Sequence, residues 1–222
     1  LLVGYTGVPS LGHAAYFGTA PYVTAILATT YAVPIGPAIV AGLLATVVIA
    51  ALFSLPALRT SGAYYLMITL ALSQVLWSLA ESWSDVTRGE NGISGVPQPD
   101  FAALSPGHGV SGYLVVVAVL FVLCGTAMLV IVRSPFGYVL KGIRENAGRM
   151  SALGYDVWRY KFAVSLVAAL FAGVAGELYL EMNSFISPSA LSVSLSAQVL
   201  LMVLAGAPGT LLRHSADDTT GA

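Results

Sequence analysis

Charged side chains are scarce in this chain. Asp, Glu, Lys and Arg make up 9% of its 222 residues, whereas hydrophobic residues make up 57%, and the mean hydropathy is +0.85. A soluble domain carries roughly 25% charged residues. Several apolar runs reach the length of about 20 residues that a helix needs to cross a bilayer. The composition therefore excludes an ordinary soluble domain and predicts an all-α integral membrane protein.

The residue patterns of common active sites are also missing. The single cysteine, Cys124, lies in an apolar run and cannot form an intrachain disulfide. His13, His108 and His214 show no metal-ligand spacing to one another, and neither a phosphate-binding loop nor a G-x-S-x-G nucleophile motif occurs. No basic patch is interleaved with exposed aromatic residues. We therefore expect a protein that is not an enzyme, uses no cofactor or metal, and does not bind nucleic acid.

The apolar runs predict a polytopic helical bundle of about six spans within residues 1–212. The four clearest spans are residues 35–56, 64–83, 113–132 and 162–182. The first segment, up to residue 32, contains several Gly residues and Pro21, and the last segment, residues 195–212, is also interrupted by Gly and Pro. We therefore expect the first and last segments to be broken.

Basic and acidic residues are sorted into different loops. Six of the 9 Lys and Arg residues lie between Arg133 and Lys161, and Arg59 falls on the same side of the predicted bundle. Loops rich in Lys and Arg mark the cytoplasmic side of a membrane protein. Residues 133–160 are therefore predicted to form a cytoplasmic loop and residues 84–112 an external loop. The chain is expected in the bacterial cytoplasmic membrane as a multi-pass protein.

The basic segment has the signals of a folded helix. Ser134 suits an N-cap and Pro135 the first helical position, and apolar residues follow at helical spacing while most basic residues point the other way. Gly154 suits a helix C-terminus, and Asp156 can cap the helix that follows. We predict an amphipathic helix with a polar face free to meet a partner. The alternative is a solvated loop that only sets topology.

A few polar residues lie within the apolar segments. Gln74 is near the middle of its span and is expected to face other helices. His13 lies in the broken first segment and is either a path-lining or a hydrogen-bonded structural residue. Glu177 and Glu181 share a helix face and are expected to reach water at the outer end of their span, because a charge at the bilayer centre costs at least ~2.5 kcal/mol. Gly7, His13 and Gln74 are the candidate pathway residues.

Motifs along nearly the whole chain occur in the order of one known family. They are GYTGVPSLGHAAYFG at 4–18, ALRTSGAYYLMITLALSQV at 57–75, NGISGVP at 91–97, GIRENAGRMSALGYDVWRYK at 142–161, FAGVAGELY at 171–179 and FISPSALSVSLSAQVLLMVLAGAPGTL at 185–211. Together they resemble the LivM-type permease subunits of bacterial ABC transporters for branched-chain amino acids. Each motif is weak by itself, but the ordered set is specific.

The resemblance implies a permease subunit that moves branched-chain amino acids across the cytoplasmic membrane with energy from separate ATP-binding subunits. By position, the coupling element that docks into those subunits would include Arg144, Glu145, Ala152, Leu153 and Gly154. The implied partners also include a second homologous permease subunit, a periplasmic or extracellular substrate-binding protein and the lipid bilayer. The alternatives are a permease for urea or short amides of the same family, or a stand-alone secondary transporter or channel.

The chain also departs from the pattern of that family. Pro21 and Glu177 stand where the family usually has small neutral residues. Family members extend further at both ends, and residues 213–222, RHSADDTTGA, form a polar tail in place of further spans. The resemblance therefore implies a truncated or atypical tail.

Overall fold

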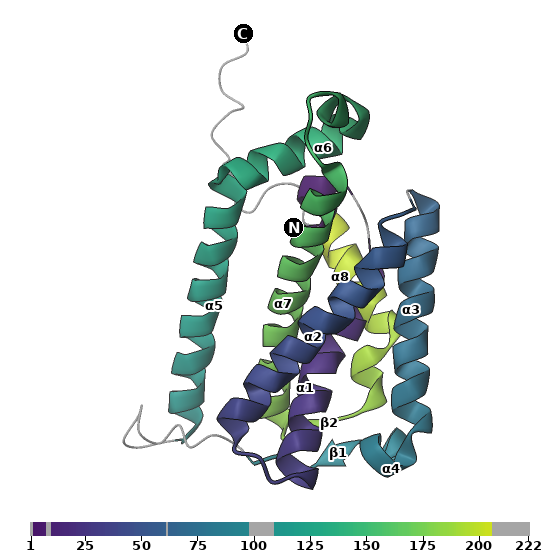
Figure 1. Cartoon of the computed structure of the whole chain (residues 1–222). Coiled ribbons are helices and arrows are strands. Elements are labelled where there is room, and N and C mark those ends of the chain that lie inside the picture. Colours follow the sequence, from purple (N-terminus) through teal and green to yellow (C-terminus); the bar gives the residue numbers. More distant parts are fainter. Residues whose placement is uncertain (1, 8–9, 61, 98–108, 206–222) are drawn as a thin grey trace.

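The computed structural model describes residues 2–7, 10–60, 62–97 and 109–205, which fold almost entirely into helices (Figure 1). The longer helices are α1 (His13–Thr30), α2 (Ile35–Ala57), α3 (Ala63–Ser82), α5 (Gly109–Arg133), α6 (Pro135–Ala152), α7 (Val157–Asn183) and α8 (Val193–Ala205). The short elements are the π-helix η1 (Leu2–Thr6), α4 (Ser84–Thr87), the 3-10 helices η2 (Gly89–Asn91) and η4 (Pro188–Leu191), and the strands β1 (Ile93–Ser94) and β2 (Phe185–Ile186). Residues 98–108 of the predicted external loop and the predicted tail at 213–222 lie outside the described residues.

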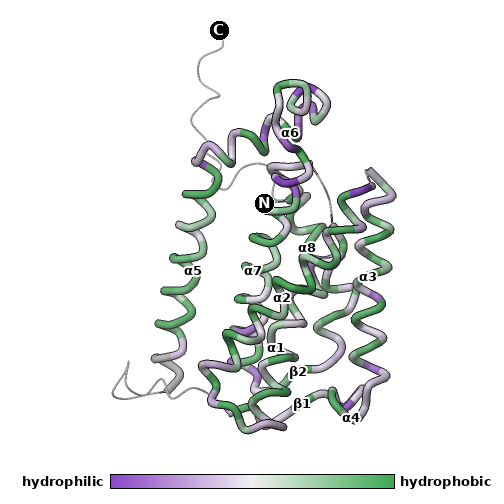
Figure 2. Tube along the Cα trace, in the orientation of Figure 1, coloured by the Kyte–Doolittle hydropathy of each residue, from purple (hydrophilic) through white to green (hydrophobic). Residues whose placement is uncertain are grey.

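Four of the described helices are long and apolar enough to cross a membrane. They are α2, α3, residues Tyr113–Arg133 of α5, and α7, and α8 is a shorter apolar helix. Figure 2 shows that hydrophilic residues gather on α6, whereas α5 is apolar along most of its length. These helices confirm the prediction of an all-α polytopic membrane protein.

The first segment is broken upstream of α1. Residues 2–6 form η1, Gly7 has φ +66°, and α1 then continues through Pro21 to Thr30. The predicted interruption is therefore at the glycines before His13, and Pro21 is accommodated inside the helix. In the last segment α8 ends at Ala205, and residues 206–212 lie outside the described part of the chain.

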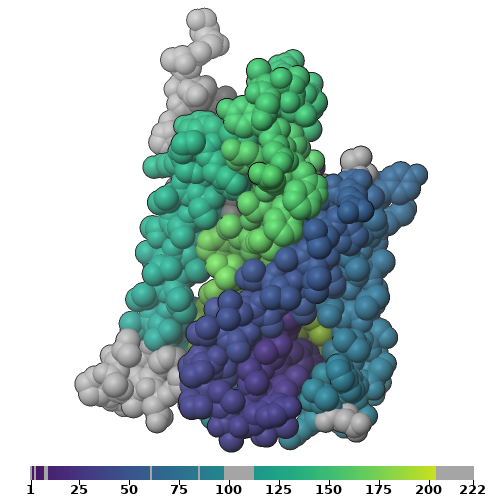
Figure 3. Space-filling model, in the orientation of Figure 1, coloured from purple at the N-terminus to yellow at the C-terminus, as the bar shows by residue number. Residues whose placement is uncertain are grey.

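Helices α1, α2 and α7 form the closely packed centre of the bundle, and α2 lies diagonally across one face (Figures 1 and 3). Small residues allow this close approach. A Cβ atom at Gly176 of α7 would overlap the carbonyl oxygen of Phe17 and lie 3.0 Å from Pro21 Cδ of α1. The small residue at this position of α7 therefore lets its helix pack directly against the α1 backbone.

The two predicted loops lie at opposite ends of the bundle (Figure 1). At one end α6 connects α5 to α7 and contacts η1. At the other end α4 and η2 lead into β1, which pairs with β2 in antiparallel register, with Ile93 opposite Ile186. Both isoleucines are buried in a cluster with Tyr22 and Leu180. This small sheet closes the end of the bundle opposite α6.

Helix α5 is held to the bundle mainly at its two ends. It joins α6 at one end, and at the other Tyr113 Oη donates to the Leu178 carbonyl oxygen at 2.8 Å. Between these points α5 and α7 leave an almost wholly apolar groove of about 530 Å³, lined in part by Cys124, Gly125 and Ala175. Cys124 is therefore partly exposed to this groove rather than fully buried.

Candidate functional site

Helix α6 begins and ends where the sequence predicts. Ser134 is extended at φ −75° and ψ 164°, and Pro135 is the first helical residue. At the other end Gly154 has φ +90°, its N–H donates to Ser151 O at 3.0 Å, and Tyr155 N–H donates to Met150 O at 3.1 Å. This pair of bonds is a Schellman motif. The prediction of a helix in the basic segment is confirmed.

A break inside α6 was not predicted. Asn146 has φ −157° and ψ 97°, and its Oδ1 accepts from the Arg149 N–H at 2.9 Å. Asn146 therefore acts as the N-cap of a second, shorter helical piece that ends at Ala152. The first piece extends from α5, and the second turns toward α7 (Figure 1). The local signal was weak: Asn is a favoured N-cap residue, and Gly148 lowers the helix propensity of this stretch.

Two basic side chains of α6 hold the N-terminal segment and are not free. Arg144 Nη1 donates to the Gly4 carbonyl oxygen, and its side chain packs against Gly7. Lys141 Nζ lies 5.6 Å from the ring centre of Tyr5 in η1. Both side chains remain exposed, so η1 meets only part of the polar face, and the availability of this face to a partner stays a prediction.

The other predicted coupling residues remain exposed. Glu145, Ala152, Leu153 and Gly154 are all exposed, and Leu153 retains 67% of its accessible surface. We call the end of α6 and the two residues after Leu153 the α6 tip; it consists of Ala152, Leu153, Gly154 and Tyr155. The α6 tip lies at the end of the bundle farthest from the β1–β2 sheet (Figure 1). Leu153 and Tyr155 are both exposed at this tip.

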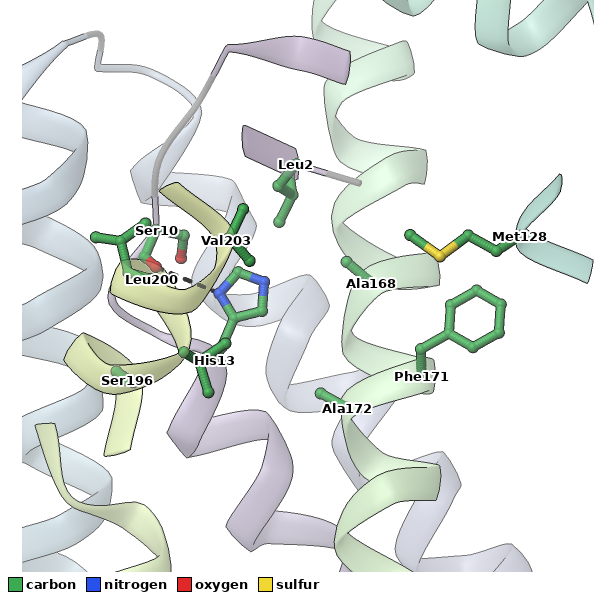
Figure 4. Close-up of a pocket in the computed structure, with 11 residues that line it drawn as sticks. Leu2, Ser10, His13, Met128, Ala168, Phe171, Ala172, Ser196, Leu200 and Val203 are labelled. Carbon is green, nitrogen blue, oxygen red and sulfur yellow. Dashed lines mark hydrogen bonds between the residues drawn. The ribbon is translucent and has the colours of Figure 1, made fainter. Parts of the chain in front are cut away.

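A cavity of about 280 Å³ lies beside the start of α1 (Figure 4). Its lining comes from five elements and the segment before α1: Leu2, Ser10, His13, Met128, Ala168, Phe171, Ala172, Ser196, Val199, Leu200 and Val203. His13, Ser10 and Ser196 lie on one side, and the apolar side chains of α7 and Met128 lie across from them (Figure 4). The cavity is thus mainly apolar, with its polar groups gathered at one wall.

The backbone just before α1 and in its first turn is satisfied by hydroxyl groups from α8, from α3 and from the segment itself. Ser196 Oγ of α8 accepts from the Ala14 N–H at 2.9 Å, and Thr69 Oγ1 of α3 accepts from the Leu11 N–H at 3.3 Å. Ser10 Oγ accepts from the Gly12 N–H at 3.2 Å. Such pairing is what allows non-helical backbone at membrane depth.

His13 both lines the cavity and forms a structural hydrogen bond. Its Nδ1 lies 3.3 Å from the Ser10 carbonyl oxygen. Because a carbonyl oxygen only accepts, Nδ1 carries the hydrogen in this contact. The two interpretations left open by the sequence are therefore compatible.

The other two candidate pathway residues lie elsewhere. Gln74 is exposed on the outer face of α3, beside Ser78 and Ser82. The expectation that it faces other helices of this chain is wrong, because α3 buries the adjacent face with Tyr65, Thr69 and Ser73. Gly7 contacts Arg144 and does not line the cavity.

Glu177 departs further from its expected position. Its side chain is only 5% exposed and turns inward, where Thr24 Oγ1 lies 2.6 Å from its Oε1. The prediction that it reaches water is wrong, because small residues of α1 and α2 leave room for the carboxyl group inside the bundle. Glu181 is only partly buried.

The chain matches a known family of membrane proteins. The model of the family described as branched-chain amino acid transport system / permease component matches residues 1–214. The chain belongs to this permease family. The resemblance in its motifs is thereby confirmed, and the ordered motifs between residues 4 and 211 lie within the matched region.

Named relatives of the permease chain are transport proteins. This chain is 27% identical over 233 residues to the high-affinity branched-chain amino acid transport system permease protein LivM of Escherichia coli K12. The alignment covers 95% of this chain and 55% of the relative. The chain is 26% identical to LivM of Salmonella typhimurium, with the same coverage of both chains. It is 29% identical over 194 residues to a probable branched-chain amino acid transport permease protein LivM of Methanocaldococcus jannaschii, covering 83% of this chain and 54% of the relative.

The permease chain spans about half the length of these curated relatives. No solved structure matches it.

Sequence reasoning missed several residues that shape the site of the permease. Thr69 and Ser196 carry no local signal, because a hydroxyl within an apolar helix has the same sequence context whether or not it meets a backbone N–H of another element. Met128 and Phe171 are ordinary span residues until the fold brings both to the cavity wall that lies across from His13 (Figure 4). Only the three-dimensional packing identifies them.

Proposed function

We propose that this chain forms the membrane-spanning part of a permease subunit of an ABC importer for branched-chain amino acids. The match of residues 1–214 to the permease family carries the proposal. The names of the E. coli and Salmonella relatives specify high-affinity branched-chain amino acid transport. Separate ATP-binding subunits would supply the energy, and the protein would reside in the bacterial cytoplasmic membrane.

The α6 tip is the proposed contact with the ATP-binding subunits. Leu153 and Ala152 supply exposed apolar surface, and Glu145 lies exposed on the first piece of α6. Gly154 caps the end of α6, and Asp156 caps the start of α7. Because both helix ends are capped there, a movement of the tip would be transmitted to α7 without unfolding either end. Arg144 contributes indirectly, since it fixes α6 against η1.

The cavity beside α1 is the proposed part of the substrate path within this chain. A leucine, isoleucine or valine side chain needs an apolar surface, which Phe171, Ala172 and Met128 supply. The hydroxyl and imidazole groups of Ser10, Ser196 and His13 offer hydrogen-bonding partners at the opposite wall. The combination of an apolar wall and a few polar groups is typical of small-molecule sites.

The outer face of α3 is the proposed contact with a second, homologous permease subunit. Gln74, Ser78 and Ser82 follow one another at helical spacing on this exposed face. Polar side chains on a membrane-spanning helix usually face protein or a water-filled cavity, because lipid offers them no hydrogen bonds. Gln74 would then line a path between the two subunits. A substrate-binding protein would meet the end of the bundle that carries β1 and β2.

Uptake in cells tests this function against its alternatives. The chain is co-expressed with its neighbouring ATP-binding, permease and binding-protein subunits in cells that lack their own leucine importers. We expect uptake of radiolabelled leucine that excess isoleucine and valine suppress and urea does not. Transport of urea or acetamide in place of leucine would favour the amide permease. Leucine uptake that persists without the ATP-binding subunits would favour a secondary transporter.

A further inference from the structure

Glu177 places a titratable side chain among three tightly packed helices. It projects from α7 toward Thr24 of α1 and Gly42 of α2. A Cβ atom added to Gly42 would overlap Thr24 Oγ1 and lie 2.6 Å from Glu177 Oε1, so the glycine makes the space that the carboxyl group fills. The proposed transport path does not use this group, which does not line the cavity beside α1.

The hydroxyl group of Thr24 has two oxygen neighbours. Its Oγ1 lies 2.6 Å from Glu177 Oε1 and 3.2 Å from the carbonyl oxygen of Ala38 in α2. A hydroxyl carries one hydrogen and can donate only one full hydrogen bond. The Ala38 carbonyl can only accept. If Thr24 donates to Ala38, the short contact with Glu177 needs a hydrogen on the carboxyl group.

The surroundings of Glu177 do not support a charged carboxylate. Its Oε2 is buried and has no hydrogen-bond partner within the part of the chain that the structure describes. The groups that the structure places next to its Oε1 from α1 and α2, the Thr24 hydroxyl and Gly42, carry no charge. On α7 the charged residue one turn further along the same face is another acid, Glu181, rather than a base. An isolated buried carboxylate is far more costly than a neutral acid of the same shape.

We propose that Glu177 is a neutral carboxylic acid in the folded protein. Its hydroxyl donates to Thr24, and Thr24 donates to the Ala38 carbonyl oxygen. This chain of two hydrogen bonds links α7, α1 and α2 at one point. Glu177 is thus a positioning residue that acts through Thr24.

Infrared spectroscopy of the purified chain in lipid nanodiscs at neutral pH tests directly whether the Glu177 carboxyl group is protonated. The difference spectrum between wild type and Glu177→Gln is expected to contain the C=O stretching band of one protonated carboxylic acid. The Glu181→Gln variant is the matched control and should leave that band in place. A difference spectrum that contains only carboxylate bands would overturn the proposal.

The Thr24→Val variant gives a second test of the hydrogen bond. Its outcome does not depend on whether the Glu177→Gln variant folds. Valine has the shape of threonine without the hydroxyl, so the acid loses its acceptor. We expect the C=O band to persist at a shifted frequency, and thermal unfolding to occur at a lower temperature than in wild type. Glu177→Gln supplies an amide N–H to Thr24 and should keep the wild-type unfolding temperature. An unshifted band in Thr24→Val would contradict the proposed hydrogen bond.

Discussion

Replacing Gly176 with Leu is expected to prevent α1 and α7 from packing. Even a Cβ atom at this position overlaps the Phe17 carbonyl oxygen, which belongs to the α1 backbone and cannot rotate away. Overpacking typically costs about 1–3 kcal/mol and occasionally more, and an overlap with fixed backbone places this change near about 3 kcal/mol. For a chain of this size, a loss of that magnitude lowers the unfolding temperature by about 6–12 °C. Thermal unfolding of the purified protein in detergent measures the shift.

Gly125→Leu is the matched control for this change. Gly125 also lies in a membrane-spanning helix, but no atom lies within 4 Å of the position of its Cβ. Its side chain would enter the apolar groove between α5 and α7. Leucine is also the better helix former, by up to about 1 kcal/mol. We therefore expect an unchanged or higher unfolding temperature. Equal losses in the two variants would show that the contact between α1 and α7 does not decide the result.

Replacing Ala172 with Phe is expected to block the cavity beside α1. Ala172 is partly buried on the wall that faces His13 (Figure 4). A benzyl group there occupies the space that we assign to the apolar side chain of the substrate. Forcing a ligand into an overfilled apolar site costs about 1–3 kcal/mol, and 1.36 kcal/mol corresponds to a factor of ten. Uptake of radiolabelled leucine should therefore fall by about fivefold to a hundredfold.

Ala175→Phe separates blocking from general damage to α7. Ala175 is exposed on the same helix and faces the groove of about 530 Å³ beside α5, which has room for the ring. Uptake in this variant should stay close to the wild-type rate at equal expression. If both variants transport leucine like wild type, the cavity is not part of the path.

Much of the helical framework could be predicted from local signals. The apolar run that begins at Ile35 became α2, because lipid requires a helix to satisfy its own backbone groups. The cap residues around α6 placed its ends, since Pro135, Gly154 and Asp156 act through their own backbone or the next few residues. These features depend on short stretches of sequence, and they were therefore visible before the fold was known.

The direction of individual polar side chains could not be predicted in the same way. Glu177 turns inward because Thr24 and Gly42, distant in sequence, supply a hydrogen-bonding partner and a space. Arg144 turns toward η1 because the Gly4 carbonyl oxygen lies there. Gln74 lies only one position beyond the buried Ser73, so a small rotation of α3 decides whether it faces helices or the outside. Each outcome depends on neighbours that the folded chain brings together.

Capture of the ATP-binding subunits is the most direct test of the proposed role of the α6 tip. Membrane-expressed wild-type chain is compared with Leu153→Asp, because Leu153 is exposed and its replacement disturbs no packed contact. Met182→Asp is the matched control, since Met182 is 70% exposed at the opposite end of α7. Burying a leucine side chain contributes about 1.5–3 kcal/mol, so its loss should weaken binding by about tenfold to a hundredfold.

The account predicts that wild type and Met182→Asp capture the ATP-binding subunits and that Leu153→Asp does not. Capture by Leu153→Asp at the wild-type level would contradict it.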